Sequence, residues 1–125
     1  RADEEALRRV AAMVGPQITV QTTGLRDLLE QLRRADVVVS ADSAAVHVAS
    51  EWFGRPVVAL FGPGVVSLYR PRSDGSVVVH HQERFDCAPC LQKRCVRPHS
   101  SCMPAITVDE VAEAVLQVVR RSGRV

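Results

Sequence analysis

The sequence predicts an α/β fold in which a parallel β-sheet carries helices on both faces. Along the 125-residue chain, segments with helical spacing of apolar residues alternate with short apolar runs. These runs are continuous rather than alternating, which is typical of parallel strands buried on both faces. Apolar residues make up 46% of the chain and charged residues 24%. Length and composition therefore suit one domain with a buried core.

The first 34 residues are predicted to form two helices with a strand between them. Residues 3–14 repeat apolar side chains near helical spacing, and three acidic residues fall in the first turn. Gly15 and Pro16 end that helix. Residues 18–21 alternate apolar and polar side chains and are predicted to form a short strand. Residues 25–34 place four leucines on one helical face.

The middle of the chain is predicted to form a strand, a polar turn, a helix and a second strand, over residues 36–40, 43–53 and 56–61. The turn places Asp42, Ser43 and the first helical amides at the carboxyl end of a strand, where α/β proteins bind phosphorylated ligands. His47 lies far enough along the helix to face back toward its N-terminus. The alternative is that Asp42 and Ser43 only cap this helix. Trp52 and Phe53 are expected in the core.

The last part of the chain combines loops with one more strand and one more helix. Residues 62–76 contain Gly-Pro and Pro-Gly pairs and are predicted to be mostly loop. Residues 77–81 are predicted to form a strand, and residues 107–121 a helix. Thr107 and Glu110 have the spacing of a capping box at the start of that helix.

Three polar or glycine-rich turns follow predicted strands, over residues 22–24, 40–43 and 62–64. The carboxyl ends of parallel strands meet at one edge of a sheet, and ligands bind outside that edge. We therefore expect the binding site at this edge.

Composition excludes several classes of partner. The formal net charge is +2 and aromatic residues make up 4% of the chain. The basic residues are scattered and few aromatic rings are present for base stacking, so a nucleic-acid partner is not expected. The sequence contains no apolar stretch of the roughly 18 residues that a membrane span needs.

All four cysteines fall in a loop predicted over residues 82–104, with the spacing C-x2-C-x4-C-x6-C. Four thiols so close in sequence could hold a structural zinc or iron ion through Cys87, Cys90, Cys95 and Cys102. Such a site would have no open position for catalysis. The alternative is a set of reduced thiols that stabilise the loop against the sheet, and disulfides are less favoured in the cytosol.

The region from Thr23 to Val119 resembles the C-terminal half of ADP-heptose:lipopolysaccharide heptosyltransferases, glycosyltransferase family 9. The family pattern includes A-D-L-V-V-S-x-D-[ST]-G-x-x-H, then P-V-x-x-L-F-G, then C-x-P-C and C-M. The matching segments here are residues 23–28, 35–49 and 56–62. The later matches are Cys87-Ala88-Pro89-Cys90, Cys95, His99 and Cys102-Met103.

The resemblance implies a Rossmann-like sheet that is part of the C-terminal domain of a GT-B glycosyltransferase. Residues 1–125 would then be a partial domain that binds the nucleotide-sugar donor, most simply ADP-heptose. By residue, the donor site falls on Asp42, Ser43, Ala44 and His47 for the diphosphate and sugar, and on Thr23, Gly24 and Leu25 for the nucleoside. No catalytic residue falls in this chain, and the chemistry requires no cofactor.

The resemblance also implies partners and a location. The acceptor would be a lipopolysaccharide-core sugar or another glycan, at the cytoplasmic face of the inner membrane. The family's first domain, and the first two strands of its second domain, find no counterpart before residue 1. We expect these parts on another segment or chain, or a sheet completed by a dimer partner, and this chain alone to be inactive.

Two departures from the family pattern favour other functions. Ala44 replaces a glycine, and residues 64–66 replace a polar T-D-P segment with Gly-Val-Val. One alternative is a non-catalytic nucleotide-binding or assembly module. A further alternative, which rests on the cysteines and not on these departures, is a small metal-binding interaction domain built on the cysteine loop.

Overall fold

The computed structural model describes residues 2–91, 94–97 and 101–123. Contacts divide the chain into two compact units, residues 1–30 and 31–125, which are described separately. The first unit contains helix α1 (Ala2–Val14) and most of helix α2 (Leu25–Arg34). Both helices match the sequence prediction, and α1 is followed directly by Gly15, whose φ of 115° suits glycine.

The strand predicted over residues 18–21 is wrong. This segment has no regular secondary structure, although it lies between the two predicted helices. An extended segment becomes a strand only when a neighbouring strand takes up its backbone hydrogen bonds. Alternation of side chains indicated the extended conformation but carried no information about a partner.

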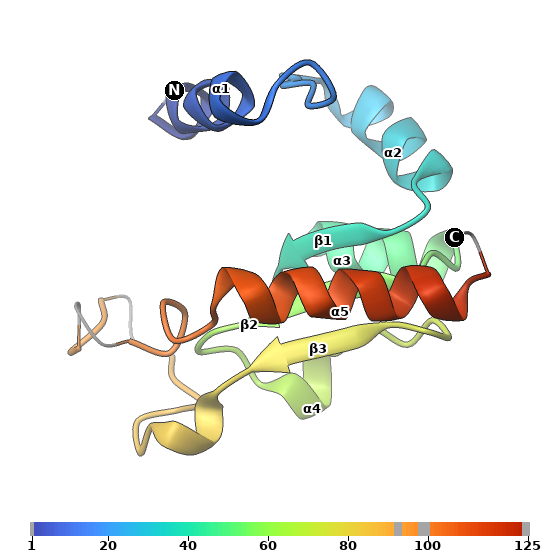
Figure 1. Cartoon of the computed structure of the whole chain (residues 1–125). Helices are drawn as coiled ribbons and strands as arrows, with labels where there is room; N and C mark the ends of the chain where they lie inside the picture. The colour runs from blue at the N-terminus through green and yellow to red at the C-terminus, as the bar shows by residue number, and fades with distance from the viewer. Residues whose placement is uncertain (1, 92–93, 98–100, 124–125) are drawn as a thin grey trace. The chain divides into compact units, whose positions relative to one another are not determined.

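The second unit is built on a three-stranded parallel sheet in the order β1-β2-β3 (Figure 1). Its strands are β1 (Val38–Ala41), β2 (Val57–Phe61) and β3 (Val77–His80). Val38 pairs with Val57, and Val58 pairs with Val77, which defines the register of the two parallel strand pairs. All three strands were predicted, within two residues at each end, from their continuous apolar runs.

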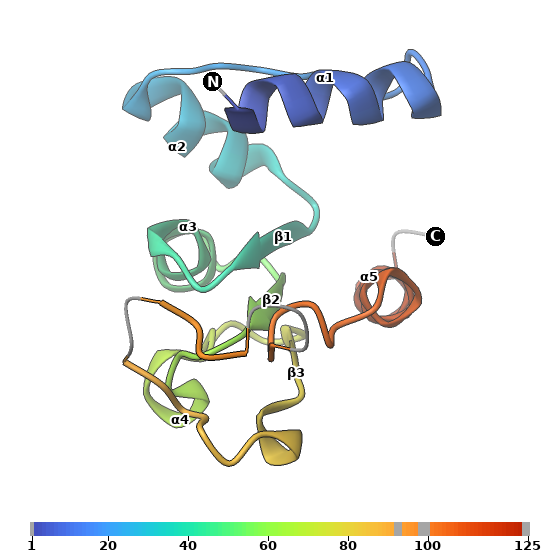
Figure 2. The ribbon, with the colours of Figure 1, turned by 90° about the vertical axis from the view of Figure 1, so that its left-hand side faces the viewer.

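Helices cover both faces of this sheet, as the sequence predicted (Figure 2). On one face lie helix α3 (Ala44–His47), the π-helical segment η1 (Val48–Trp52) and helix α4 (Val66–Tyr69). On the other face lies helix α5 (Val108–Arg121). Each face has its own apolar core, because alternate residues of a strand point to opposite faces. The first core contains Val46, Ala49, Val57, Ala59 and Phe61, and the second contains Val58, Ala114 and Val118.

The helix predicted over residues 43–53 is present, but its second half is π-helical. The Phe53 N–H donates to the Val48 carbonyl at 3.2 Å, which spans five residues instead of four. The prediction that Trp52 lies in the core is wrong, since Trp52 is 73% exposed. The extra residue in the π-helical turn changes which side chains face the sheet. Phe53 packs against the core as expected.

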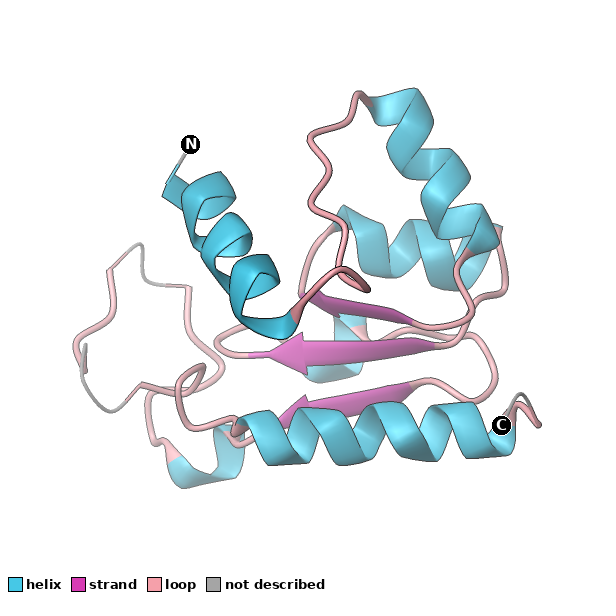
Figure 3. Ribbon diagram, turned by 45° about the horizontal axis from the view of Figure 1, so that its top comes forward, coloured by secondary structure: helices cyan, strands magenta, loops and turns pink. Residues whose placement is uncertain are grey.

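The connection between β2 and β3 contains a short helix, α4, where only loop was predicted. The cysteine-rich loop between β3 and α5 begins with a 3₁₀ turn, η2 (Gln82–Arg84). Helix α5 lies beside β2 and β3 along its length (Figure 3). Its predicted capping box is confirmed: the Glu110 N–H donates to Thr107 Oγ1 at 3.2 Å, and the Thr107 N–H donates to Glu110 Oε2 at 2.8 Å. Among the described helices, none is both long and apolar enough to cross a membrane.

Candidate functional site

The carboxyl ends of the three strands meet at one edge of the sheet. Asp42 follows β1, the 62–64 turn follows β2, and Gln82 lies two residues beyond β3. The Asp42 N–H donates to the Leu60 carbonyl at 3.2 Å, which extends the ladder by one bond. The Gln82 side-chain amide donates to the Gly62 carbonyl at 2.8 Å. The expectation that the 40–43 and 62–64 turns share an edge is therefore confirmed. The 22–24 turn was part of the same prediction, but it follows no strand, because residues 18–21 do not form one.

The Asp42 turn leads directly into helix α3. Ser43 occupies the N-cap position with extended φ and ψ, but its side chain makes no capping hydrogen bond. Instead, its hydroxyl lies 3.0 Å from the Ser40 hydroxyl. The alternative in which the Ser43 side chain serves as an N-cap thus finds no support in the structure. Asp42, Ser43 and Ala44 are all exposed to solvent. The first amides of a helix have no partner within the helix and favour anions.

His47 ends α3 and is held by neighbours from two elements. Its Nδ1 lies 3.1 Å from Oε1 of Glu51, one turn along in η1. The Tyr69 ring of α4 meets the His47 ring edge-on, with the ring centroids 6.4 Å apart. The His47 side chain is 35% exposed, so the ring is neither a core residue nor fully in solvent. These contacts occupy one ring nitrogen and leave Nε2 for another partner.

Thr23, Gly24 and Leu25 lie in the first unit, at the start of helix α2. The Gly24 carbonyl accepts a hydrogen bond from the Leu28 N–H at 3.1 Å, so it begins the helical pattern. Leu25 is 73% exposed, and a Cβ added at Gly24 would meet no described atom within 4 Å. These three residues are therefore open to solvent within their unit, and their contact with a nucleoside stays a prediction.

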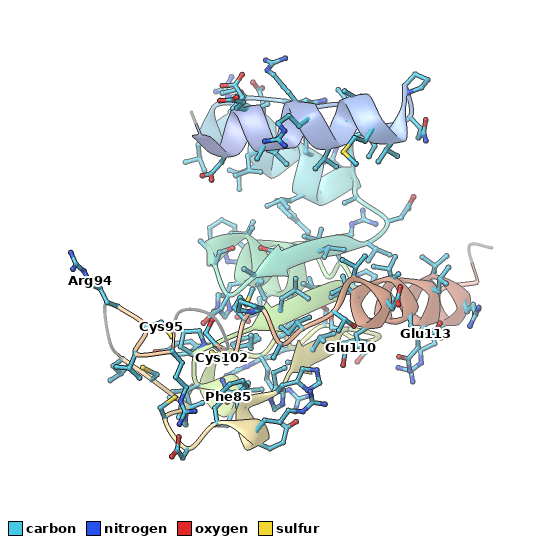
Figure 4. All side chains as sticks on the ribbon, turned by 60° about the vertical axis from the view of Figure 1, so that its left-hand side comes forward. Phe85, Arg94, Cys95, Cys102, Glu110 and Glu113 are labelled. Carbon is cyan, nitrogen blue, oxygen red and sulfur yellow. The ribbon has the colours of Figure 1, made fainter. Side chains whose placement is uncertain are left out.

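The cysteine-rich loop packs against the same edge of the sheet. The Cys90 N–H donates to the Pro63 carbonyl at 2.8 Å, and Cys102 and Met103 lie against Gly62. All four cysteines line one cavity of about 200 Å³. Figure 4 shows Cys95 and Cys102 in this loop with Phe85, while Arg94 extends away from it. The cavity is completed mainly by apolar side chains, among them Pro63, Phe85, Val96 and Met103.

All four cysteines around this cavity are thiols in the structure. All four cysteines are described, and none of them forms a disulfide. Within the described residues, no three His, Cys, Asp or Glu side chains are grouped closely enough to hold an ion. His99 lies outside the described residues. A structural zinc or iron ion at these cysteines stays a prediction.

A second polar cluster joins the end of β3 to the start of α5. His81 is buried, and its Nε2 lies 2.6 Å from Glu110 Oε1. The hydrogen bonds that Glu110 accepts from Thr107, first from the backbone N–H and then from the hydroxyl, hold the pKa of Glu110 below its usual value of 4.5. The bond from His81 acts in the same direction. This cluster fixes α5 on the sheet.

Sequence reasoning missed four residues around the site: Glu51, Gly64, Tyr69 and Gln82. Two of these residues could have been predicted from the sequence. Glu51 lies four residues after His47, on the same face of a helix, and Gln82 directly follows the end of a predicted strand. Gly64 was treated only as part of a turn. The contact of Tyr69 with His47 depends on α4, which the sequence did not predict.

Comparison with known proteins decides the family. The model of glycosyltransferase family 9 (heptosyltransferase) matches residues 1–100. The chain belongs to glycosyltransferase family 9. The resemblance inferred from the Asp42 turn and the cysteine spacing is therefore confirmed.

Curated relatives of this family 9 chain carry matching names. It is 25% identical over 100 residues to lipooligosaccharide heptosyltransferase 2 of Campylobacter jejuni serotype O:2, covering 80% of this chain and 31% of that protein. It is 31% identical over 97 residues to lipopolysaccharide heptosyltransferase 1 of Pseudomonas aeruginosa, covering 75% of this chain and 26% of that protein. The chain thus spans less than a third of the length of either relative. No solved structure gives a significant match.

Proposed function

We propose that this chain is the donor-binding portion of a glycosyltransferase that transfers a heptose from a nucleotide sugar, with ADP as the nucleotide. The observation that carries the proposal is the turn from Asp42 to His47 at the carboxyl edge of a parallel sheet. This is where open α/β sheets bind ligands. Family membership supports the same assignment.

Each group in the turn has a role in this proposal. The first amides of α3 and the Ser43 hydroxyl bind diphosphate oxygens, since both are hydrogen-bond donors beside a positive helix end. Ala44 presents only a methyl group there, so the diphosphate approaches the backbone over a small side chain. His47 contributes Nε2, because Nδ1 faces Glu51. Asp42 accepts a hydrogen bond from a sugar hydroxyl. Thr23, Gly24 and Leu25 contact the nucleoside.

The reaction is a direct displacement at the anomeric carbon of the heptose. The acceptor oxygen attacks that carbon, its proton passes to a general base, and the diphosphate departs with the bonding electron pair. This chain's groups stabilise the charge that develops on the departing diphosphate. No metal or other cofactor is needed for that role, because amides and a histidine supply the donors.

The rest of the machinery belongs to a larger GT-B assembly in this proposal. The general base and the acceptor site lie on another segment or partner chain, since these 125 residues span less than a third of each relative. The acceptor is a lipopolysaccharide-core sugar or another glycan at the cytoplasmic face of the inner membrane. The names of both relatives support this class of acceptor.

Calorimetric titration of ADP and ADP-heptose into the protein tests the proposal. We expect both ligands to bind wild-type protein, and an Asp42→Ala, His47→Ala double variant to lose most of the affinity. Both positions lie outside the buried core, so the variant should stay folded, which circular dichroism checks. A folded wild-type protein that binds neither ligand would contradict the proposal and favour a non-catalytic assembly module.

A further inference from the structure

Because Gly64 has no side chain, the Asp42 carboxylate occupies the space where a Cβ of residue 64 would lie. A Cβ added at Gly64 would overlap Asp42 Oδ2, and would lie 3.4 Å from Asp42 Cγ and 3.4 Å from Phe61 Cδ1. The φ angle of Gly64 lies outside the left-handed region, so the backbone there would accept alanine. The reason for glycine at this position is therefore space for the carboxylate and not backbone conformation.

The turn that contains Gly64 is held from two sides. The half-buried Gln82 side chain donates through Nε2 to the Gly62 carbonyl at 2.8 Å and also to the Gly64 carbonyl. The Cys90 N–H donates to the Pro63 carbonyl at 2.8 Å. All three carbonyls of the turn are thus hydrogen-bonded to the segment after β3. A turn held in this way resists moving, so a side chain at residue 64 would displace Asp42 instead.

We propose that Gly64 and Gln82 are positioning residues that set the Asp42 carboxylate for the sugar of the donor. The inference rests on the function proposed above and assigns roles to two residues that do not themselves touch the donor. Gln82 fixes the turn, the turn places the Gly64 Cα, and that Cα fixes one side of the Asp42 carboxylate.

A hydrogen bond between a carboxylate and a sugar hydroxyl weakens steeply with distance and angle. Displacing Asp42 should therefore weaken binding of ADP-heptose by about tenfold, the effect of losing one charge-assisted hydrogen bond. Binding of ADP, which lacks the sugar, should change little. This difference between the two ligands separates a positioning role from general damage to the fold.

A double-mutant cycle between Gly64→Ala and Asp42→Ala tests the proposal, with ADP-heptose and ADP titrated into each variant. We expect Gly64→Ala to weaken ADP-heptose binding in wild-type protein and to have almost no further effect when Asp42 is already alanine. Additive losses in the cycle would overturn the proposal. Equal losses for ADP and ADP-heptose would overturn it as well.

The variant Gln82→Leu tests the same positioning role without changing Gly64. Leucine is close to glutamine in size but cannot donate to the two carbonyls, so we expect a selective loss for ADP-heptose in the same direction. Gln17→Leu is the matched control. Gln17 also donates a side-chain hydrogen bond to a backbone carbonyl, that of Val14 at 2.9 Å, but it lies in the first unit. This control should bind both ligands as wild-type protein does.

Failure of the proposed function and failure of this inference give different results. If wild-type protein binds neither ligand, the proposed function fails, and with it the part of the inference that concerns the donor. The ¹³C shift of the Asp42 carboxyl group then tests positioning in the free protein. An Asp42 signal that is unchanged in both Gly64→Ala and Gln82→Leu would overturn the positioning role.

Discussion

At the scale of single residues, His47 shows how a side chain is oriented before any ligand arrives. Glu51 faces its Nδ1 and Tyr69 meets its ring, so the ring has partners from η1 and α4. In the neutral ring, Nδ1–H donating to Glu51 leaves Nε2 as an acceptor, and in the charged ring Nε2–H is a donor. The function proposed for His47, donating to a diphosphate oxygen, therefore requires the ring form that carries Nε2–H.

Replacing Glu51 with alanine should weaken ADP binding by about two- to threefold, the equivalent of about 0.5 kcal/mol for an exposed pair. The reason is that the His47 ring loses the acceptor that orients it. Glu51→Gln keeps an acceptor oxygen at the same distance along the side chain and should bind more tightly than Glu51→Ala. Calorimetry measures the three affinities. Identical affinities for wild-type protein and Glu51→Ala would show that the pair has no role in binding.

At the scale of elements, helix α5 is attached to the sheet by a polar cluster at its first turn. Glu110 accepts from Thr107 in the capping box and also contacts His81, which follows β3 directly. Glu110 therefore takes part both in the cap of its own helix and in a contact with His81, which lies 29 residues earlier in the sequence. A capping box alone would only begin the helix.

The lowered pKa of Glu110 predicts a pH dependence of stability. A carboxyl group whose pKa is lower in the folded state stabilises the fold above its usual pKa of 4.5, and this stabilisation is lost as the pH falls through the lowered value. We expect Glu110→Gln to unfold more easily than wild-type protein at neutral pH. Because glutamine does not titrate, the difference should shrink below about pH 4.5.

Urea unfolding of both proteins between pH 7 and pH 3 measures this difference. Glu113→Gln is the control, because Glu113 lies on the same helix and its partner, Arg120, is 3.6 Å away on the surface. A gap between wild-type protein and Glu110→Gln that stays constant over the whole range would contradict the prediction.

In the described part of the cysteine-rich loop, the Cys90 N–H donates to the Pro63 carbonyl, and the side chains around the cavity add packing against the same turn. The hypothesis of a structural metal predicts one zinc or iron ion per chain and four thiols that react only after the metal is removed. Elemental analysis together with thiol titration measures both. Protein without metal and with four reactive thiols would favour the alternative of reduced thiols packed against the sheet.

At the scale of the whole molecule, β2 is the centre of the second unit. Val57, Val58, Ala59 and Phe61 are fully buried, and β2 has a hydrogen-bonded neighbour on each side. Helix α1 is different: Leu7 is 54% exposed and Met13 is 86% exposed. The two units therefore differ in how much apolar surface they bury, which determines local stability.

Hydrogen exchange should follow this difference. We expect the amides of β2 to exchange slowest in the chain, through global unfolding, and those of α1 to exchange much faster, through local opening. Mass spectrometry after peptic digestion resolves the two segments. Equal protection of α1 and β2 would show that α1 is packed as firmly as the sheet.

Much of the fold could be predicted from the sequence because it depends on local patterns. The apolar runs at β1, β2 and β3, the leucines of α2 and the capping box of α5 each lie within a few neighbouring residues. The Asp42 turn could be located for the same reason, since its place after a strand and before a helix is itself a local pattern. The family model matches residues 1–100, which include the three strands, α2 and the Asp42 turn.

The sequence by itself therefore determined the α/β class, the three strands and the four longer helical segments, and it indicated the carboxyl edge of the sheet as the candidate site. Only the tertiary structure decided that residues 18–21 form no strand, that Trp52 is exposed, and that Gly64 lies against Asp42 in a turn bonded by Gln82. The physical reason is the same in each case. A strand needs a partner strand, the exposure of a side chain depends on what packs against it, and the Asp42 carboxylate lies against a turn more than 20 residues away in sequence. A local sequence pattern contains none of this information.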